Sequence, residues 1–215
     1  KKHIKATTII VLIAQKTKNV YERRFLEFGP SPKGVYWQTI KTQYARFETL
    51  IKAIDKIDTN GGIKIADFGC GYGAFYEYIK FRKFMINSYY FGYDTSPSMI
   101  KEAKNQLPNV NFICSDKILE NVDYSFISGT FNMAFDYSIS TWENYIFNQL
   151  TDCFSMTRKV LTFNLLFSKI TKIEKNLFYT NAKNIESFCN KNLGPCLIVK
   201  TPTLNNDITI FVRKN

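Results

Sequence analysis

The stretch IKIADFGCGYGAFYEYI, residues 63–79, decides the fold of this chain. Its first part, from Ile63 to Phe68, is a short apolar run with β-branched residues, which predicts a central parallel strand buried on both faces. Alternate glycines follow in 69–73, where the absence of Cβ atoms permits positive φ and lets a ligand approach the backbone. Apolar residues then recur near helical spacing from Ala74 onward. The stretch therefore predicts a strand, a ligand-binding turn and a helix whose free N–H groups face the ligand.

Two ligand classes use such a turn. Gly69-x-Gly71-x-x-Ala74 satisfies the dinucleotide fingerprint, in which the start of the helix receives a pyrophosphate. The alternative is a cradle for S-adenosylmethionine (SAM), in which an acidic residue before the first glycine faces the positively charged methionine part. Asp67 stands at that place and favours SAM. A glycine-rich turn that binds no ligand is the third interpretation.

Two further strands in 88–104 and 109–118 each end in an acidic residue. Asp94 is placed to accept hydrogen bonds from a ribose diol, a feature that both ligand classes share. Ser115 and Asp116 follow the third strand, where the dinucleotide fingerprint has no acid. A single aspartate is often a solvated loop residue or a helix cap, but acids at the ends of three successive strands favour a ligand site.

These motifs resemble a known family. Asp67–Gly73, Asp94 and Ser115–Asp116 resemble the SAM-binding motifs of class I SAM-dependent methyltransferases. The resemblance extends to a subgroup of small, stand-alone bacterial methyltransferases of poorly defined substrate through Ser31–Trp37, Ser128–Asn132, Phe163–Leu166 and residues 177–189. It covers about residues 28–213 and implies SAM as methyl donor and S-adenosylhomocysteine (SAH) as product.

The resemblance also implies a set of site residues. The residues expected to contact the cofactor are Asp67, Gly69, Cys70, Gly71, Gly73, Asp94, Thr95, Met99, Ser115, Asp116, Ser128, Tyr36, Trp37 and Arg46. The polar residues expected near the transferred methyl group are Ser128, Asn132 and Asn164. Asn132 could equally cap the following helix, and Asn164 could equally end the fifth strand.

Tyr36, Trp37 and Arg46 belong to a predicted amino-terminal lid over the cofactor. Packing of Trp37 against the sheet is the competing interpretation, and a surface ion pair is the ordinary role of an arginine such as Arg46. Cys70, inside the glycine turn, is interpreted as a small packing residue rather than a reactive thiol.

The acceptor is less well indicated. The N-methyltransferase signature [DN]-P-P-[YFW] is absent after the fourth strand, where Ser128–Asn132 stands, so adenine or glutamine N-methylation is disfavoured. The dipeptide Pro195-Cys196 comes too late in the chain for a cytosine C5 nucleophile. The single histidine, His3, is near the terminus, which argues against a histidine general base.

Composition agrees with one globular core. The chain has 215 residues and 45% hydrophobic content, and we expect a helical lid or extension at 1–58 and a SAM-binding domain at 59–215. The apolar run Ile9–Ala14 is too short to span a bilayer, so no membrane contact is expected. Five scattered cysteines without a C-x-x-C pair argue against a disulfide framework or a structural metal and suggest a reducing, cytoplasmic location.

The net charge of +11 raises a nucleic-acid hypothesis, because basic surfaces bind phosphate backbones. The lysines are spread through the chain without an arginine-rich run, so solvated surface lysines are favoured over a nucleic-acid groove. The same charge would suit an acidic or phosphorylated small molecule.

The order of predicted elements indicates an α/β fold with a Rossmann-like, seven-stranded, mostly parallel sheet and helices on both faces. The strands are expected near 63–68, 89–94, 110–114, 124–129, 159–166, 195–201 and 207–213. The last two are separated by TPTLNND, which has no room for a helix and predicts an antiparallel hairpin. A dinucleotide domain would continue instead with a crossover helix.

The sequence therefore predicts a SAM-dependent methyltransferase that acts on a small molecule. A methyltransferase of RNA or another macromolecule is the first alternative, and a catalytically silent SAM-fold binding module is the second. The oligomeric state, the acceptor atom and the role of residues 1–27 are not indicated by the sequence.

Overall fold

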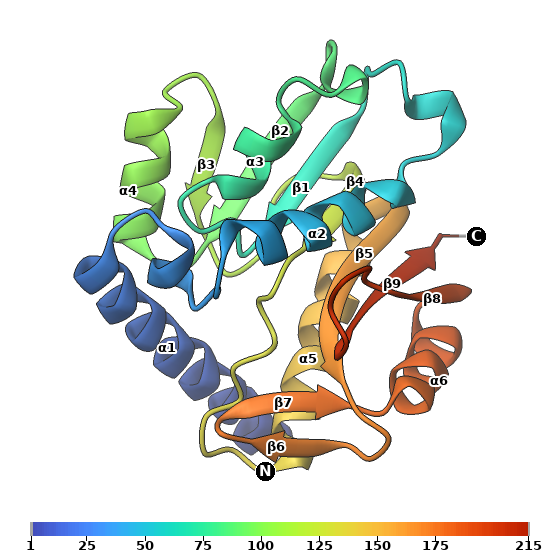
Figure 1. Ribbon diagram of the computed structural model, residues 1–215. Coiled ribbons are helices and arrows are strands. Elements are labelled where there is room, and N and C mark those ends of the chain that lie inside the picture. Colours follow the sequence, from blue (N-terminus) through green and yellow to red (C-terminus); the bar gives the residue numbers. More distant parts are fainter. Residues whose placement is uncertain (1, 215) are drawn as a thin grey trace.

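The computed structural model describes the backbone of residues 2–214 and the side chains of residues 8–214 (Figure 1). The helices are α1 (Lys2–Phe28), α2 (Ile40–Leu50), α3 (Ala74–Ile79), α4 (Pro97–Gln106), α5 (Ile139–Ser155) and α6 (Ala182–Asn192), with 3-10 turns η1 (Pro32–Val35), η2 (Ile51–Ala53), η3 (Lys56–Asp58) and η4 (Lys83–Met85). The strands are β1 (Lys64–Phe68), β2 (Tyr89–Asp94), β3 (Asn111–Cys114), β4 (Val122–Ile127), β5 (Thr157–Phe167), β6 (Lys172–Glu174), β7 (Leu177–Thr180), β8 (Cys196–Lys200) and β9 (Asp207–Arg213).

One mixed sheet forms the centre of the molecule. Strands β3, β2, β1, β4 and β5 are neighbours in that order and pair in parallel. The chain then returns through β9, which pairs antiparallel with β5 and with β8. This confirms the predicted parallel sheet and terminal hairpin. A dinucleotide domain would have a crossover helix where this chain has the β8–β9 hairpin.

The predicted number of seven strands was too low. The described residues form a 9-stranded sheet, because β6 and β7 make an additional hairpin after β5. This hairpin pairs with β5 only at Leu166 and Phe167, at the carboxyl end of that strand. The sequence around it carries no long apolar run, because the two strands have only 3 and 4 residues and only Phe178 and Thr180 of β7 are buried.

The sheet is buried on both faces, as the apolar run of β1 predicts. Ile65 and Ala66 are neighbours in β1, yet they belong to two different core clusters, one on each face. The cluster that contains Ile65 packs against α2, α3 and α4, whereas the cluster that contains Ala66 packs against α5. Trp142 of α5 is fully buried and donates its Nε1–H to the Phe131 carbonyl at 3.0 Å, so it belongs to the core.

The helix boundaries follow local signals. Ser96 caps α4 by accepting a hydrogen bond from the Met99 N–H, with Pro97 at the first helical position. Ser138, not Asn132, caps α5, because a loop separates β4 from that helix. Asn132 accepts a hydrogen bond from the Leu166 N–H instead and ties this loop to β5.

Helix α1 lies across the molecule beside the carboxyl ends of the parallel strands (Figure 1). Ile13 is fully buried in the same core cluster as α5. Lys16 forms an ion pair with Asp136 in the loop before α5, and Glu22 accepts a hydrogen bond from the Ser96 hydroxyl at the start of α4. Among the described residues, no helix is both long and apolar enough to cross a membrane.

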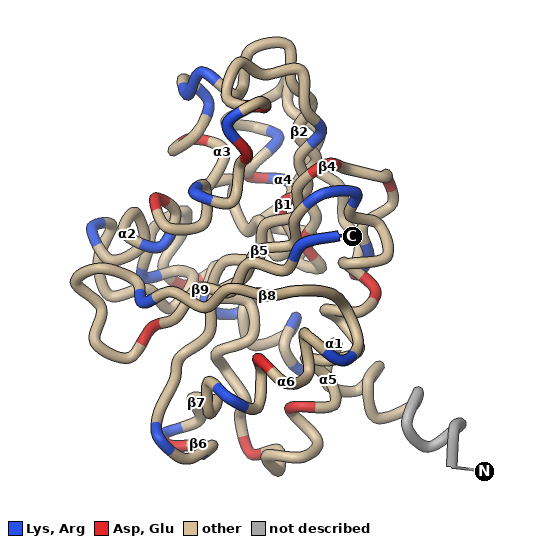
Figure 2. Tube along the Cα trace, turned by 90° about the vertical axis from the view of Figure 1, so that its right-hand side faces the viewer, with Lys and Arg blue, Asp and Glu red and all other residues tan. Residues whose placement is uncertain are grey.

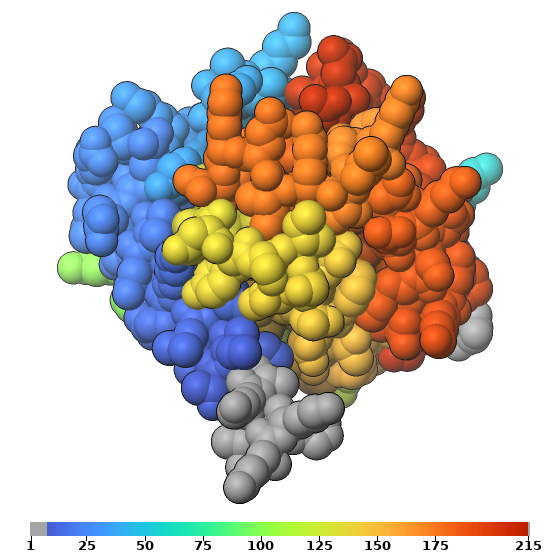
Figure 3. Space-filling view, turned by 90° about the horizontal axis from the view of Figure 1, so that it is seen from below, coloured from blue at the N-terminus to red at the C-terminus, as the bar shows by residue number. Residues whose placement is uncertain are grey.

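Figure 3 shows the face on which α1, the loop between β4 and α5, and the β6–β7 hairpin meet. The Ala134 N–H donates to the Asn176 carbonyl at 2.8 Å, which joins the loop to the hairpin. The Lys16–Asp136 pair joins the same loop to α1, so the loop connects α1 with the β6–β7 hairpin at that end of the sheet.

Candidate functional site

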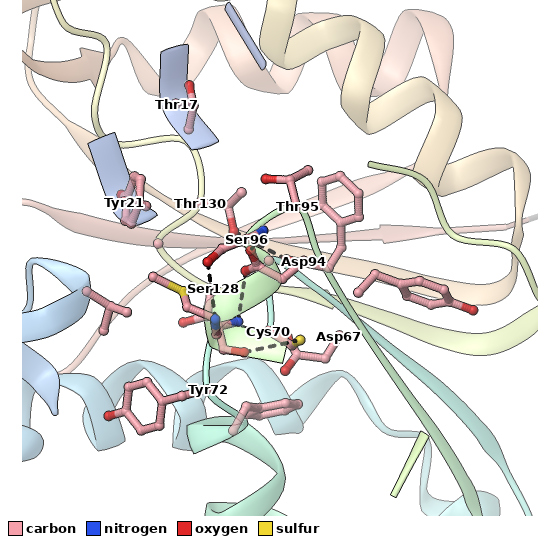
Figure 4. Close-up of a pocket in the computed structure, with 18 of the residues that line it drawn as sticks. Thr17, Tyr21, Asp67, Cys70, Tyr72, Asp94, Thr95, Ser96, Ser128 and Thr130 are labelled. Atoms are coloured by element: carbon pink, nitrogen blue, oxygen red, sulfur yellow. Dashed lines mark hydrogen bonds between the residues drawn. The ribbon is translucent and has the colours of Figure 1, made fainter. Parts of the chain in front are cut away.

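A cavity lies at the carboxyl ends of β1, β2, β3 and β4, where open parallel sheets bind their ligands. Its lining residues come from α1, α2, α5 and the loops after these strands. Figure 4 shows Thr17 and Tyr21 on one side of this cavity, Tyr72 on the opposite side, and Asp94, Ser96 and Ser128 between them. Residues at the ends of the strands therefore line one side of the cavity, and residues of α1 line the side away from the sheet.

The turn between β1 and α3 has the backbone that the glycines predict. Gly69, Gly71 and Gly73 have φ values of +80°, +55° and +89°. A Cβ atom at Gly71 would point toward the Met99 sulfur and Val35, both of which line the cavity, at 3.7 and 3.8 Å. A side chain at this position would therefore occupy the space in which a ligand can lie.

Asp94 holds the glycine turn against the end of β2. One carboxylate oxygen accepts a hydrogen bond from the Gly71 N–H at 2.9 Å, and the other accepts one from the Ser96 N–H at 2.9 Å. Burial raises the pKa of Asp94, although these N–H donors counteract the effect. A carboxylate has about four lone-pair sites, so both oxygens can still accept hydrogen bonds from a ligand diol.

Asp67 is the more deeply buried acid, with 1% of its surface exposed. Its Oδ2 accepts a hydrogen bond from the Tyr90 hydroxyl at 2.5 Å. Burial raises the pKa of Asp67 to about 7, the Tyr90 hydrogen bond lowers it, and the nearby Asp94 charge raises it. A cation placed in the cavity would favour the ionised form of this carboxyl.

Most of the predicted cofactor contacts are brought together around the cavity. Those that line it are Asp67, Gly69, Cys70, Gly71, Asp94, Thr95, Met99, Ser115, Asp116, Ser128 and Trp37. Burial raises the pKa of the Cys70 thiol, which keeps it protonated and agrees with its interpretation as a packing residue.

Five predicted site residues do not line the cavity. They are Gly73, Tyr36, Arg46, Asn132 and Asn164. Gly73 caps α3. Tyr36 is 39% exposed and packs edge-on against Tyr21. The side chain of His3 lies outside the described residues.

Arg46 belongs to a buried network behind the cavity wall. Its Nε lies 2.5 Å from Oδ2 of Asp207, a carboxylate that is 1% exposed, so the predicted surface ion pair is a buried one. Asn164 donates its amide N–H to the same Oδ2 at 3.1 Å and accepts the Gly129 N–H at 2.8 Å. The Arg46 guanidinium stacks on Trp37 at 4.2 Å from the ring centroid.

Gly129 contacts two members of this network, Asn164 through its N–H and Trp37 through its Cα. A Cβ atom there would lie 2.7 Å from the Trp37 ring, so indole and backbone are in direct contact. Trp37 and Gly129 line the cavity, whereas Arg46, Asp207 and Asn164 stand behind them. The ion pair therefore holds the part of the wall next to Ser128 in place.

Several lining residues were not predicted from the sequence. They include Ala14, Thr17, Lys18 and Tyr21 of α1, Gln43 of α2, Tyr72, and Tyr145 and Gln149 of α5. The α1 residues share one helical face, a spacing visible in the sequence. No sequence signal indicates what that face covers.

Thr17 Oγ1 and Ser128 Oγ are buried hydroxyl oxygens of residues that line the cavity, and neither has a hydrogen-bond partner among the described residues. Buried polar groups are nearly always hydrogen-bonded in folded proteins. Their positions on opposite elements, α1 and the end of β4, therefore mark two places where a polar ligand would be bound.

Comparison with known proteins agrees with this site. A family model described as a methyltransferase domain matches residues 65–162, which include the glycine turn and all three strand-end acids. A Mycobacterium tuberculosis protein named "Putative methyltransferase Rv1506c" is 30% identical over 155 residues, covering 70% of this chain and 92% of the relative.

Solved structures share the fold at low sequence identity. The magnesium protoporphyrin IX methyltransferase (ChlM) of Synechocystis PCC 6803 with bound SAH superposes with a TM-score of 0.68 at 11% identity, covering 95% of this chain and 99% of ChlM. The pyocyanin biosynthetic protein PhzM superposes with a TM-score of 0.63 at 12% identity, covering 89% of this chain and 61% of PhzM. At these identities the comparison establishes a common fold.

Proposed function

Because this chain belongs to the class I SAM-dependent methyltransferases, we propose that it transfers the methyl group of SAM to a small molecule that enters the cavity at the carboxyl ends of the strands. The observation that carries the proposal is the wall made by α1, which places Ala14, Thr17, Lys18 and Tyr21 over the cavity. A macromolecular acceptor needs an open groove leading to the methyl group, whereas a cavity partly covered by a helix suits a small acceptor.

The residues of the cavity fit the cofactor. The missing Cβ at Gly71 leaves room for a ligand beneath Val35 and Met99. In this proposal Asp94 binds the ribose diol, Asp116 the adenine amino group, and Asp67 the positively charged methionine part, and all three line the cavity. When bound, SAM supplies an electrophilic methyl group, so the protein has to align the acceptor and exclude water.

We propose that Ser128 orients the acceptor. Its buried, unpartnered hydroxyl lies at the end of β4 next to Gly129. Asn164 and Asn132 act through the backbone in this proposal, because their side chains hold the Gly129 and Leu166 N–H groups. We also propose a division into a helical lid or extension at 1–58 and a SAM-binding domain at 59–215.

The charge distribution supports a small acceptor over a nucleic acid. Figure 2 shows Lys and Arg scattered along helices, strands and loops of the chain. Lys18 is the only Lys or Arg among the residues that line the cavity, and Asp67, Asp94 and Asp116 also line it. The cavity wall therefore does not favour an acidic or phosphorylated acceptor over a neutral one. ChlM and PhzM are named for small-molecule chemistry, which is consistent with this proposal.

The test is methyl transfer from methyl-labelled SAM to a cell extract separated into small-molecule, protein and RNA fractions. We expect label in the small-molecule fraction. Label confined to RNA or protein would overturn the proposal. Tight SAM binding without transfer to any fraction would also overturn it, and would support a silent binding module instead.

The same assay tests Ser128. Ser128→Ala should slow transfer to the labelled acceptor by about 5- to 10-fold, the value of one neutral hydrogen bond of about 1 kcal/mol. Ser155→Ala at the exposed end of α5 is the control, because its hydroxyl bonds only the Asp152 carbonyl of its own helix. Equal rates for the two variants would remove Ser128 from the acceptor site.

SAM binding should depend on pH through Asp67. The charged carboxylate attracts the cationic cofactor, and a pKa of about 7 means that this form is lost as the pH falls. SAM affinity, measured by calorimetry, should therefore be about tenfold lower at pH 6 than at pH 8 if only the charged form binds. Asp67→Asn should bind weakly with little pH dependence.

Tyr90→Phe provides the matched test of this dependence. The Tyr90 hydroxyl donates to Asp67 and lowers its pKa, so its removal should move the midpoint of the SAM affinity curve to higher pH. A midpoint that is unchanged in Tyr90→Phe, or a wild-type affinity that is flat between pH 6 and pH 8, would contradict the role of Asp67.

A further inference from the structure

Helix α1 is fixed to the molecule on both sides of the cavity. Lys16 pairs with Asp136 before α5, and Glu22 accepts the Ser96 hydroxyl at the start of α4. Ser96 in turn donates its N–H to Asp94. The segment between Lys16 and Glu22 therefore has a defined position over the ends of the strands.

One face of α1, mostly within this segment, lines the cavity. Ala14, Thr17, Lys18 and Tyr21 follow the i, i+3, i+4, i+7 spacing of a single helical face, and all four line the cavity. The Thr17 hydroxyl oxygen is buried and has no hydrogen-bond partner among the described residues. A threonine in a helix commonly bonds the carbonyl one turn earlier, so an unpartnered hydroxyl that faces a cavity points to a ligand atom.

The neighbours of Tyr21 show which end of the cavity this face covers. Burial raises the pKa of Tyr21, and Tyr36, Asp94 and Tyr145 lie close enough to raise it further. Burial and the Asp116 charge likewise raise the pKa of Tyr145. Tyr21 of α1 therefore lies near Asp94 and near Tyr145, which in turn is near Asp116. Figure 4 shows Thr17 and Tyr21 on the α1 side of the cavity that also contains Asp94.

We propose that Thr17 binds the adenosyl part of the cofactor through its side-chain hydroxyl, so that α1 is one wall of the cofactor site. The inference rests on the proposed placement of ribose at Asp94 and adenine at Asp116. The chemical partner is a ribose hydroxyl or an adenine nitrogen, either of which can bond to a threonine hydroxyl. Tyr21, one turn further along α1, supplies apolar ring surface beside it.

The test compares Thr17→Val with Thr17→Ser in the full chain, using calorimetry with SAH and with 5′-methylthioadenosine, which lacks the amino-acid part. Thr17→Val should weaken both ligands by about 5- to 10-fold, because one hydrogen bond of about 1 kcal/mol is lost. Thr17→Ser should stay within about twofold of the wild type, because it keeps the hydroxyl. Asn19→Ala, on the exposed side of α1, is the control and should leave both affinities unchanged.

The unfolding midpoint of the ligand-free protein separates binding from a structural role. Because the hydroxyl has no partner in the protein, Thr17→Val should leave this midpoint equal or slightly higher. A lower midpoint with unchanged affinities would overturn the proposal. Weakening of SAH alone, with 5′-methylthioadenosine unaffected, would overturn the adenosyl assignment. Absence of SAH binding to the wild-type protein would instead refute the proposed cofactor site as a whole.

Discussion

Replacing Asp94 with alanine is expected to lower the affinity for SAH by at least about 100-fold, since hydrogen bonds to a charged group are worth about 1.5–3 kcal/mol each. The carboxylate would bind the two hydroxyls of the ribose diol. It also holds the N–H groups of Gly71 and Ser96, both at 2.9 Å, and so fixes the glycine turn. The substitution therefore removes ligand contacts and the support of the turn together.

Calorimetry with SAH measures this effect, and thermal unfolding of the ligand-free variant shows whether the fold persists. Asp152→Ala removes an exposed aspartate from α5, away from the cavity lining, and should change neither result. Asp94→Asn keeps the shape but loses the charge, so its SAH affinity should fall between those of the wild type and Asp94→Ala. An Asp94→Ala variant that retains full SAH affinity would rule out the ribose assignment.

Replacing Arg46 with methionine should lower the free energy of unfolding by about 3–5 kcal/mol, the usual cost of leaving a buried charge without its partner. Asp207 is 1% exposed and would keep only the Thr201 hydroxyl and the Asn164 amide as donors. The same change removes the guanidinium that stacks on Trp37. Chemical denaturation followed by circular dichroism measures the loss.

Two variants test the cause of this loss. Arg46→Met combined with Asp207→Asn should recover part of the stability, because no unpaired charge then remains buried, and the double-mutant cycle measures the coupling. Arg82→Met breaks the Arg82–Glu48 pair, whose side chains are 41% and 49% exposed, and should cost less than about 1 kcal/mol. If Arg46→Met and Arg82→Met cost the same, Arg46 does not compensate a buried charge.

The local part of the site could be predicted from the sequence. Local sequence signals specify a strand that carries Asp67 near its end, glycines with positive φ in 69–73 and a helix from Ala74. Each of these features depends only on residues close together in the chain. The hairpin of β8 and β9 was predicted for the same reason, since the segment between them is too short for a helix. Asp94 and Ser96 also lie where strand and cap signals place them.

The environment of these residues could not be predicted. Asp67 was correctly placed at the end of β1, but its raised pKa depends on its burial and on the Tyr90 hydroxyl from β2. Arg46 was expected either at the cofactor or in a surface ion pair, whereas it pairs with Asp207, 161 residues further along the chain. No local periodicity specifies such a partner.

The sequence by itself determined the strands from β1 to β5, the terminal hairpin, the glycine turn and the acids at the strand ends, because these are set by backbone preferences and short-range spacing. Only the tertiary structure decided that Thr17 of α1 lines the cavity, that the β6–β7 hairpin extends the sheet, and that Asn164 accepts a hydrogen bond from the Gly129 N–H. These contacts join segments far apart in the chain, and each depends on how whole elements pack around the sheet.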